Sequence, residues 1–588
     1  PQAVNALAQG ALGYLFLPVH AWTALDAFCR ALRRQRTGKG LLAWTTSAES
    51  EARAKGQDGL RRFWPAMVAG LLFLFAAPSP AARIAGAFFI ATPLITWFSG
   101  RPARPADDSL RPADKEVLRS YTAAMWRYYE DFAGEDDHFL PPDNVQEAPV
   151  HAVAHRTSPT NIGLALLATL AARDFGLIDG ETLYRRIEGT IATMEHLPKW
   201  NGHLYNWYNT RTLAPLRPAY VSTVDSGTLL CCLTALYEGL RDYAAEAPFA
   251  PLRARIRRLM DDTDMAVLYN KRRKLFHIGY DLEKNELSSI YYDLLMSEAR
   301  LASYYAVARR VVPKRHWGTL GRTLTRQSGY TGPVSWTGTM FEYLMPHLLL
   351  PVYEDSLSAE TLRFVLYCQK RRVRSHGVPW GISESGFYAF DAALNYQYEA
   401  HGVQKLALKR GMDNDLVVSP YSTFLALPFD TANSLRNLEH LEKLGLYGRC
   451  GFFEAVDFTA ARTGGRGAIV KSYMAHHVGM SIVACANALF GGVMQERFLR
   501  NSSMRAAQDL LQEKIPSGAV VFHDVPRREI PDKPGRGQFV REEFEQVSPA
   551  TPRAHTIANG EYTLVLTDCG VSVSYTHLRA HETCADLV

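Results

Sequence analysis

Cysteines and the common cofactor motifs are scarce in this sequence. Only 8 cysteines are present, and none forms a CxxC pair or a spacing typical of metal sites. This usage is typical of a reducing compartment and indicates that no disulfide framework is present. No GxSxG elbow or dinucleotide fingerprint occurs, and RTGKG at 36–40 lacks the spacing of a P-loop. These absences argue against redox, nucleotide-dependent and serine-hydrolase chemistry.

A basic surface with interleaved aromatics is also missing from most of the chain. The net charge is +6, and nine of the 65 Lys and Arg residues fall between Arg30 and Arg62, where only three acids occur. No comparable basic cluster follows. The sequence therefore argues against nucleic acid as a partner.

Charge is absent from three apolar segments near the start of the chain. Residues 1–25, 63–82 and 84–100 contain no Asp, Glu, Lys or Arg, and a short PSP connection joins the last two. These two are near the lower limit of about 17 residues for a membrane span. We predict a transmembrane helical hairpin, with a buried globular helix pair as the alternative. Basic residues on both sides of the hairpin then place the remaining chain in the cytoplasm.

Helical periodicity is the main feature of residues 105–520. Apolar positions recur at helical spacing in 115–132, 160–175, 180–196, 226–245, 251–268, 288–310, 357–372, 433–445 and 471–488. Similar aromatic, glycine-rich connectors return at 201–209, 274–281, 380–391 and 447–458. This weak internal repetition predicts a mainly α protein in which helical hairpins close into an (α/α)6 toroid. The connectors would then converge on one cleft.

The two ends of the chain have a different character. The first residue is not methionine, so we expect a piece of a longer protein. Residues 1–104 are predicted to hold the membrane helices and the basic loop. Short β-rich runs with an NGEY turn in 521–573 predict the start of a β-sandwich. Residues 574–588 include SYTHLRAHET, which resembles a translated sequencing adapter, and they carry no fold prediction.

The connectors concentrate aromatic side chains. They contribute Trp200, Tyr205, Trp207, Tyr208, Trp336, Trp380, Phe387 and Tyr388. Aromatic faces beside carboxylates and amides are typical of a carbohydrate cleft, although any one of these rings could instead fill the centre of the toroid. Taken together, they favour a sugar-binding site.

Several carboxylates lie among these aromatics. Glu298 falls on an apolar stripe of the helix predicted at 288–310, where partial desolvation would raise its pKa and suit a general acid. The alternative is a buried glutamate paired with an arginine. Glu342 and Glu454 are further candidates beside aromatics. His476 and His477 are adjacent and no third ligand is evident, so we predict no metal site.

These motifs resemble the central glycoamylase-like, or cyclization, domain of cyclic β-1,2-glucan synthases. The resemblance covers nearly all of residues 115–515. It is carried by HFLPPDNVQE (138–147), VAHRTSPTNIGLALL (153–167), HLYNWYNTRTLAPLRPAYVSTVDSG (203–227), YYDLLMSEARLASYYAVA (291–308), SWTGTMFEYLMP (335–346), WGISES (380–385) and NYQYEAHGVQKLALKRG (395–411). It implies a retaining transglycosylase that cyclizes linear β-1,2-glucan without a cofactor. It also implies flanking transferase and phosphorylase-like regions in one synthase polypeptide of the bacterial inner membrane, with this domain on the cytoplasmic side.

The resemblance also implies roles for individual residues. Glu384 in WGISES is similar to the nucleophile and Glu298 in MSEARL to the acid/base. The substrate-binding residues that we expect are Trp207, Tyr208, Asp225, Trp336, Glu342, Tyr343, Trp380, Tyr388, Tyr398 and Glu399. Two alternatives stay open: an inverting endo-β-1,2-glucanase of the same fold, and a glucan-binding module without activity. Retention needs carboxyl groups about 5–5.5 Å apart, whereas inversion needs about 6.5–9.5 Å.

Overall fold

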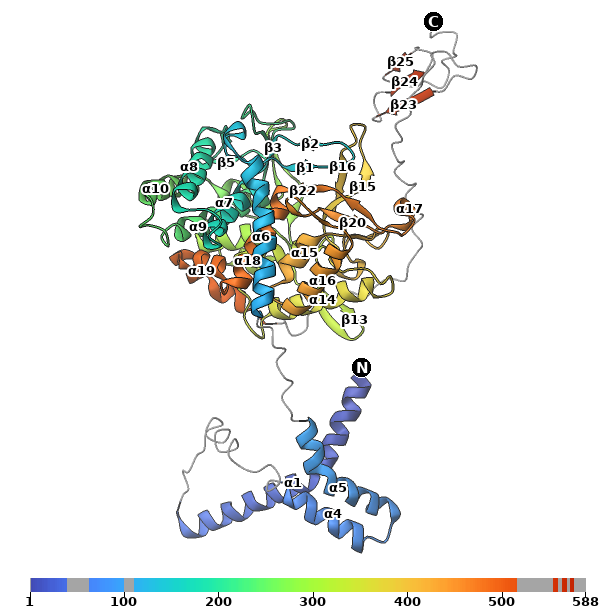
Figure 1. The fold of residues 1–588 in the computed structure, drawn as a ribbon. Coiled ribbons are helices and arrows are strands. Elements are labelled where there is room, and N and C mark those ends of the chain that lie inside the picture. The colour runs from blue at the N-terminus through green and yellow to red at the C-terminus, as the bar shows by residue number, and fades with distance from the viewer. Residues whose placement is uncertain are drawn as a thin grey trace. The chain divides into compact units, whose positions relative to one another are not determined.

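The computed structural model describes residues 2–39, 63–99, 110–514, 554–558, 563–567 and 572–575 (Figure 1). The chain divides into two compact units, Pro1–Ser109 and Leu110–Val588, which are described separately. Most of the basic segment between Arg30 and Arg62 lies outside the described residues, as do 576–588.

The described residues of the first unit form three helices: α1 (Gln2–Thr37), α4 (Trp64–Ala76) and α5 (Pro80–Ser99). Helices α4 and α5 form the predicted hairpin. They approach closely because Gly70 and Gly86 face each other, and a Cβ at either glycine would lie 2.7 Å from the other's carbonyl oxygen. Within the described residues, no single helix is long and apolar enough to cross a membrane. Among the described helices, one bent pair formed by 475–489 and 493–500 qualifies by length and composition alone.

The second unit is mainly helical. Its helices of seven or more residues are α6 (Pro112–Phe132), α7 (Pro159–Asp174), α8 (Gly180–His196), α9 (Thr223–Gly239), α10 (Phe249–Asp262), α11 (Arg300–Ala308), α14 (Leu357–Arg374), α15 (Pro420–Ala426), α16 (Thr431–Lys443), α18 (Ala475–Leu489) and α19 (Val493–Arg500). Shorter helices are α12 (Arg315–Thr319), α13 (Met340–Leu344), α17 (Ala460–Thr463) and α20 (Ser502–Ala506). Eight of the nine predicted helical segments are confirmed within a few residues at their starts.

Buried and amphipathic helices alternate along this unit. Helices α7, α9, α11, α13, α15 and α18 bury almost their whole surface, whereas α6, α8, α10, α14 and α16 bury one face. A helix that is apolar all round must be covered on all sides, and an amphipathic helix supplies the outer cover. The buried helices pack in sequence: α7 against α9, α9 against α11, α13 against α15, and α15 against α18.

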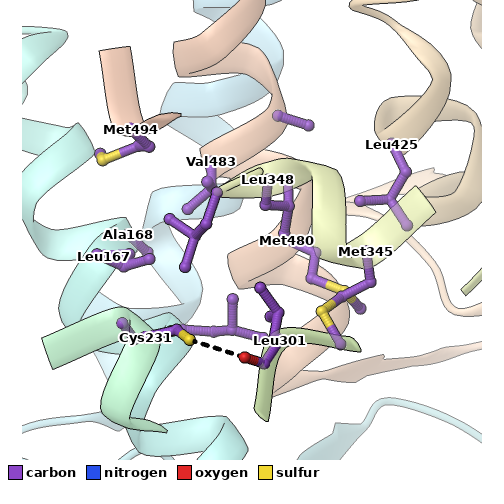
Figure 2. Close-up of a cluster of buried hydrophobic side chains, with 14 of the residues drawn as sticks. Leu167, Ala168, Cys231, Leu301, Met345, Leu348, Leu425, Met480, Val483 and Met494 are labelled. Carbon is purple, nitrogen blue, oxygen red and sulfur yellow. Dashed lines mark hydrogen bonds between the residues drawn. The ribbon is translucent and has the colours of Figure 1, made fainter. Parts of the chain in front are cut away.

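Helix α18 then returns to pack against α7, the first buried helix. Figure 2 shows where they meet: Leu167 and Ala168 of α7, Cys231 of α9, Leu301 of α11 and side chains of α15 and α18 form one apolar cluster. Between α11 and α13 the link is polar, because the Arg300 guanidinium donates to the carbonyl of Tyr343 over 3.0 Å. This arrangement places the first turns of the buried helices near one another.

The aromatic connectors form short antiparallel strand pairs. The connector after α14 becomes β15 (Ser385–Phe390), which pairs with β16 (Tyr396–Glu399). Strand β1 (Asn144–Gln146) pairs with β22 (Ser472–Met474). Strand β22 comes directly before α18 in the chain. Figure 1 shows β1, β15, β16 and β22 gathered on one side of the helices. The polypeptide therefore returns repeatedly to the same side between helices.

Two regions differ from the sequence-based expectations. The helix predicted at 288–310 is wrong in its first half: β12 (Tyr291–Tyr292) pairs with β9 (Leu275–His277), and α11 begins only at Arg300. Strand pairing of two tyrosines overrides the helical periodicity there. Near the end of the chain, β23 (Ala554–Ala558), β24 (Thr563–Thr567) and β25 (Ser572–Tyr575) form one three-stranded sheet. The sheet agrees with the predicted strands, but a sandwich is not shown, and residues 574–575 belong to it.

The contact between α9 and α11 predicts a large effect of one methyl group. A Cβ added at Gly227 would lie 2.2 Å from Cβ and 2.5 Å from Cα of Ala302, so the helices must move apart. We expect Gly227→Ala to lower the free energy of unfolding by about 1–3 kcal/mol, measured by chemical denaturation. Gly318→Ala is the control, because a Cβ there meets nothing within 4 Å. Equal stability of the two variants would contradict the close approach.

Candidate active site

The polar residues at the first turns of the buried helices converge on one place. The residues are Asn161 of α7, Asp225 of α9, Glu298 just before α11, Glu342 of α13, Tyr421 of α15, and His476 and His477 of α18. Direct contacts join several of them: Thr160 donates to Asp225 over 2.6 Å, and His476 lies 3.0 Å from Asn161. Glu384 enters the same place from the connector between α14 and β15.

The loop around Glu384 is fixed on both sides by side chains of neighbouring helices. Gln369 of α14 binds both the N–H and the carbonyl of Ile382, at 2.9 and 2.8 Å. The Ser383 hydroxyl accepts from the Phe341 N–H at 3.0 Å. Tyr421 donates to the carbonyl of Glu384 at 2.9 Å. Gly381 has φ 124, a conformation that favours glycine, so the sharp turn before Glu384 is encoded locally.

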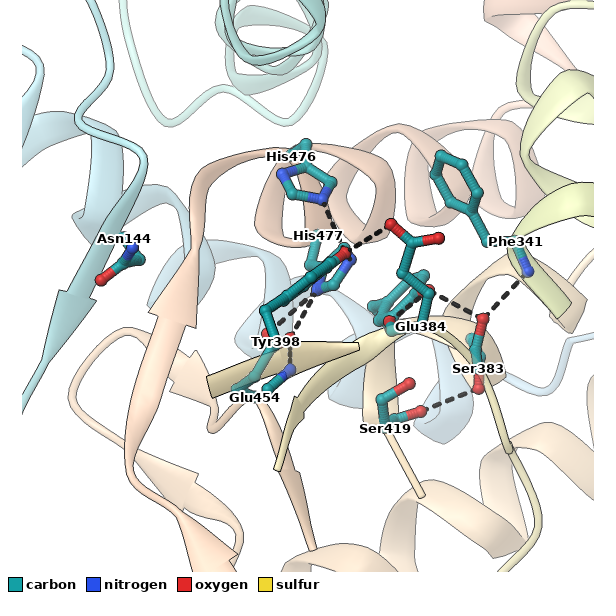
Figure 3. Close-up of polar contacts among 12 residues, drawn as sticks. Asn144, Phe341, Ser383, Glu384, Tyr398, Ser419, Glu454, His476 and His477 are labelled. Carbon is teal, nitrogen blue, oxygen red and sulfur yellow. Dashed lines mark hydrogen bonds and ion pairs between the residues drawn. The ribbon is translucent and has the colours of Figure 1, made fainter. Parts of the chain in front are cut away.

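The Glu384 carboxylate faces the site and is partly exposed. Tyr398 of β16 donates its hydroxyl proton to Oε1 over 2.9 Å (Figure 3). Burial raises the pKa of Glu384 to about 7, and the charges of Glu342, Glu454 and Asp225 act in the same direction. The hydrogen bond from Tyr398 acts against this rise, because it stabilises the charged form. Glu384 is therefore a carboxyl group that ionises near neutral pH.

Glu298 lies in the turn before α11 and not on a helix stripe. The residues on either side of it, Ser297 and Ala299, are buried, and its own side chain is partly exposed. Ser297 donates to Oε2 over 3.2 Å. Burial raises the pKa of Glu298 to about 8, with the charges of Glu342 and Glu384 acting in the same direction. At neutral pH Glu298 is therefore mostly protonated, as a general acid requires.

The arginine nearest in sequence does not pair with Glu298. Arg300 is buried and donates to the carbonyl of Tyr343 and to Nε2 of His347. Among the described residues no ion pair joins Glu298 to a cation. The structure thus favours the desolvated acid over the alternative of a glutamate neutralised by arginine.

Glu342 has a structural partner for each oxygen. Its carboxylate accepts from the Ser335 hydroxyl at 2.7 Å and from both the N–H and the hydroxyl of Thr337. Together with Thr339 it forms the capping box of α13. Only 5% of its surface is exposed. The structure places Glu342 beneath the site, where its charge raises the pKa of Glu298 and Glu384.

Three of the aromatic residues expected to bind substrate lie in the core. Tyr208 and Tyr343 are fully buried, and their hydroxyls bind backbone carbonyls of Pro198 and of Pro333 and Leu406, respectively. Trp380 is 7% exposed and its backbone N–H and carbonyl bind Asn437. These placements correct the expectation of direct substrate contact, because the rings present almost no surface. The sequence pattern does not separate a ring that fills the core from one that lines a cleft.

Other predicted contacts do reach the surface of the site. Trp336 is 43% exposed and its indole N–H donates to Asp293 over 3.1 Å. Trp207 is half-buried, and the guanidinium of Arg156 lies 4.9 Å from its ring centroid. Tyr398 is 39% exposed. Trp336 and Tyr398 are therefore accessible to a ligand, whereas the guanidinium of Arg156 lies over the ring of Trp207.

Asp225, Tyr388 and Glu399 are half-buried. Burial raises the pKa of Asp225, and the hydrogen bond from Thr160 acts against this. Tyr388 lies on β15, with its N–H bound to Asp457 at 3.1 Å. Glu399 is opposite Ser385 in the β15–β16 pair. Asp225 lies near enough for its charge to raise the pKa of Glu384, and Tyr388 and Glu399 lie on the strand pair that follows Glu384. Their contact with substrate stays a prediction.

The paired histidines are held by different partners. His477 Nδ1 is 2.9 and 3.0 Å from the two carboxyl oxygens of Glu454, and His477 stacks on Tyr421 with ring centroids 3.7 Å apart. His476 Nδ1 is 3.0 Å from Oδ1 of Asn161. Among the described residues no group of three or more His, Cys, Asp or Glu could hold a metal ion. The histidines therefore belong to a hydrogen-bond network around Glu384.

Sequence reasoning did not find Tyr421, Asn161 or Asp143. Asn161 donates to Asp143 over 3.1 Å and thereby joins His476 to the first connector of the unit. Asn161 and Tyr421 each lie in the first turn of a helix, in TSPTN and VSPYS, where Ser-Pro marks the N-terminus, whereas Asp143 directly precedes β1. The recurrence of Ser-Pro at two such starts was the available signal.

Two family models match adjacent parts of the second unit. Residues 291–502 match the glycoamylase family, and residues 120–297 match a family of unknown function, DUF3131. The two matches overlap at residues 291–297. Glu298 and Glu384 both lie in the glycoamylase match.

A curated relative covers almost the whole chain. It is the cyclic β-(1,2)-glucan synthase NdvB of Rhizobium meliloti, which is 33% identical over 706 residues and matches 96% of this chain. Along almost its whole length the chain is therefore similar to a cyclic β-1,2-glucan synthase. It spans about a quarter of the length of this relative, because the match covers 25% of NdvB.

Solved structures resemble the fold of this chain. An endo-β-1,2-glucanase from Chitinophaga pinensis, in complex with sophorotriose and glucose, superposes with a TM-score of 0.55 at 15% identity. That match covers 68% of this chain and 98% of the glucanase. An endo-β-1,2-glucanase from Talaromyces funiculosus, in complex with sophorose, gives a TM-score of 0.55 at 14% identity, over 69% and 95% of the two chains. At these identities the likeness shows the fold alone.

Proposed function

We propose that this chain is a retaining transglycosylase that cyclizes linear β-1,2-glucan. The observation that carries the proposal is the pair Glu384 and Glu298. Two connectors bring these carboxyls to one site, where burial raises the pKa of Glu384 to about 7 and that of Glu298 to about 8. At a pH between these values one group is ionised and the other protonated, as a nucleophile and an acid must be.

The fold supports this role. We infer that the six buried helices close into an (α/α)6 toroid. Helices α7, α9 and α11 pack in series, as do α13, α15 and α18, Arg300 of α11 bonds to Tyr343 of α13, and α18 returns to α7. Their first turns then surround the site, and the exposed rings of Trp336 and Tyr398 border it. An open, aromatic-lined cleft can bind an extended sugar chain along its length. We propose that this chemistry needs no metal or cofactor.

The reaction proceeds in two displacements. Glu298 protonates the glycosidic oxygen of the leaving segment while a Glu384 oxygen attacks the anomeric carbon, which breaks the C–O bond and forms a glycosyl ester. The 2-hydroxyl at the non-reducing end of the same glucan then attacks that carbon. Glu298 takes the hydroxyl proton, the ester bond breaks and Glu384 leaves as a carboxylate. Two inversions restore the β configuration, so a β-1,2-linked ring results.

Two other functions compete with cyclization. An inverting endo-β-1,2-glucanase would use Glu384 to activate a water, and the fold of the two glucanases is shared with this chain. A glucan-binding module without activity needs no ionisable pair. The similarity to a cyclic glucan synthase over 96% of the chain favours the cyclizing enzyme over both.

Membrane tethering is a separate proposal. The apolar hairpin of α4 and α5 and the flanking basic segments suggest attachment to the bacterial inner membrane, with the second unit on the cytoplasmic side. Because the chain spans a quarter of NdvB, we propose that the remaining synthase polypeptide is its partner.

Product mass tests the proposed function. We expect incubation of the purified chain with linear β-1,2-glucan to give products that lack one water relative to linear oligomers of the same length. Rings with β-1,2 linkages throughout require retention. If only reducing oligomers form and the first-formed anomer is α by NMR, the chain is an inverting glucanase. If the glucan binds but its length distribution stays unchanged, the chain is a binding module.

The two raised pKa values predict a narrow pH profile. Below about pH 7 Glu384 becomes protonated and cannot attack, and above about pH 8 Glu298 loses the proton that it must donate. We therefore expect kcat/KM for linear glucan to rise with pH through about 7 and to fall through about 8. Initial rates across this range measure it, in buffers of constant ionic strength. A plateau that extends from pH 5 to 7 would contradict the raised pKa of Glu384.

A further inference from the structure

The hydroxyl of Tyr398 is surrounded by three polar atoms that the proposed mechanism does not explain. It lies 2.9 Å from Oε1 of Glu384, 3.4 Å from Nε2 of His477 and 3.5 Å from Nε2 of His476 (Figure 3). A phenol has one proton to donate, so the protonation of the two imidazoles decides where that proton points.

His477 donates to Tyr398. Its Nδ1 faces the buried carboxyl of Glu454, whose Oε1 also accepts from the N–H of Gly386 over 3.1 Å. Burial raises the pKa of Glu454 to about 8 and lowers that of His477 to about 3. The single proton of Tyr398 points to Glu384, so a hydrogen bond between the Tyr398 oxygen and Nε2 of His477 requires the imidazole proton on Nε2 and a protonated Glu454 carboxyl that donates to Nδ1. This imidazole proton points to the oxygen of Tyr398.

His476 has the opposite tautomer. Its Nδ1 lies 3.0 Å from Oδ1 of Asn161, and the amide of Asn161 donates to Asp143 with its nitrogen. Oδ1 can only accept, so His476 carries its proton on Nδ1. Burial lowers the pKa of His476 to about 3, which keeps the ring neutral. Its Nε2 therefore presents a lone pair to Tyr398.

We propose that Tyr398 is a hydrogen-bond switch for Glu384, positioned by Glu454 and His477 on one side and by His476 on the other. In the free protein Tyr398 accepts from His477 and donates to the Glu384 carboxylate, which is nearer than His476 and charged. When Glu384 becomes a glycosyl ester it loses its charge, and the Tyr398 proton turns to the lone pair of His476. No net proton transfer accompanies the switch.

The switch rests on the proposed nucleophilic role of Glu384 and deepens it. A hydrogen-bond donor that always stayed on the Glu384 carboxylate would slow its attack, because the donor stabilises the charged form that must react. Because Tyr398 can turn to His476, less hydrogen-bond energy is lost when the ester forms. The hydrogen bond to Glu384 is restored when the carboxylate leaves. The other ionisable groups near these residues are Asp143, which is paired with Arg156, and Glu298, Asp225 and Glu342 near Glu384. Among the described residues, Tyr398 is the side chain that donates a hydrogen bond to the Glu384 carboxylate.

The ionisation of Glu384 tests the switch without any glucan. A water-soluble carbodiimide with an amine labels protonated carboxyls, so the extent of labelling of the peptide containing Glu384, followed by mass spectrometry against pH, reports its pKa. We expect Tyr398→Phe to raise the midpoint by about one pH unit, because a donor to the charged form is lost. Tyr421→Phe is the matched control: it removes a phenol hydroxyl that contacts only the backbone carbonyl of Glu384 and Ser383, and we expect no shift.

Two further variants test the positioning residues. His477→Phe keeps the ring stacked on Tyr421 but gives Tyr398 no donor, so we expect a smaller upward shift. Glu454→Gln keeps a donor toward Nδ1 and an acceptor toward Gly386, and it removes a charge that acts to raise the pKa of Glu384, so we expect a midpoint at or below that of the wild type. An unshifted midpoint in Tyr398→Phe, or a shift in Glu454→Gln equal to that of His477→Phe, would overturn the switch. Circular dichroism of each variant excludes unfolding as the cause of a shift.

Turnover separates this inference from the proposed function. We expect Tyr398→Phe to lower kcat for linear β-1,2-glucan about tenfold and to move the acid limb of the pH profile upward with the labelling midpoint. If the wild-type chain shows no turnover while the labelling shifts appear as expected, the hydrogen-bond arrangement stands and the proposed function fails. If turnover occurs but neither the midpoint nor the acid limb moves, the proposed function stands and the switch fails.

Discussion

Replacing Glu384 with glutamine is expected to reduce the rate of ring formation by about 10³-fold or more, on the order of 4 kcal/mol of activation free energy. The amide cannot attack the anomeric carbon, whereas the clamped loop around it remains in place. Gln369 and Tyr421 hold the backbone of that loop, and the N–H of Phe341 holds the Ser383 hydroxyl. None of these contacts uses the Glu384 carboxylate. The variant should therefore fold and bind glucan normally.

Steady-state rates, with binding measured in parallel, check this expectation. Glu181→Gln is the control, since Glu181 is exposed in the first turn of the outer helix α8. We expect the control to retain wild-type rates. A loss of no more than about tenfold in Glu384→Gln would contradict the nucleophile, and an undisturbed affinity with lost turnover would support it.

The outer framework of the second unit could be predicted from sequence because it depends on local periodicity. Helices α6, α7, α8 and α14 begin within a few residues of the expected positions, since each combines a 3.6-residue pattern with a start signal such as Ser-Pro or Asp-Gly. The connectors were also visible, because repeated aromatic and glycine residues separate the helices.

The interior of the site could not be predicted, because it depends on contacts between distant segments. His476 and Asn161 are 315 positions apart in the sequence, and Tyr398 and His477 are 79 positions apart. Glu298 was identified as a desolvated acid for a wrong local reason: the turn before α11, and not a helix stripe, buries it. Tyr208 and Tyr343 share the composition of the exposed rings, yet tertiary packing places them in the core.

Glu298→Gln provides the second large expected effect and separates the two carboxyl roles. With linear glucan, whose leaving group is a sugar hydroxyl, we expect a loss of about 10²–10⁴-fold, the range for removal of a general acid. A short β-1,2-glucan ending in an acidic phenol needs no protonation to leave. We expect its glycosylation step, seen as a burst of phenol, to retain a rate near that of the wild type.

The pH profile of the same variant supplies an independent test. The fall in rate through about pH 8 is attributed to Glu298, so it should disappear in Glu298→Gln, while the rise through about pH 7 should remain because Glu384 is intact. Loss of the Glu298 charge also removes one repulsive neighbour of Glu384. The rise in rate through about pH 7 should therefore not move to higher pH. If the phenol burst falls as far as the natural reaction, Glu298 acts on more than the leaving group, and the acid/base assignment is wrong. If the basic limb persists unchanged, another group titrates there, and Glu454, whose pKa burial raises to about 8, becomes its first candidate.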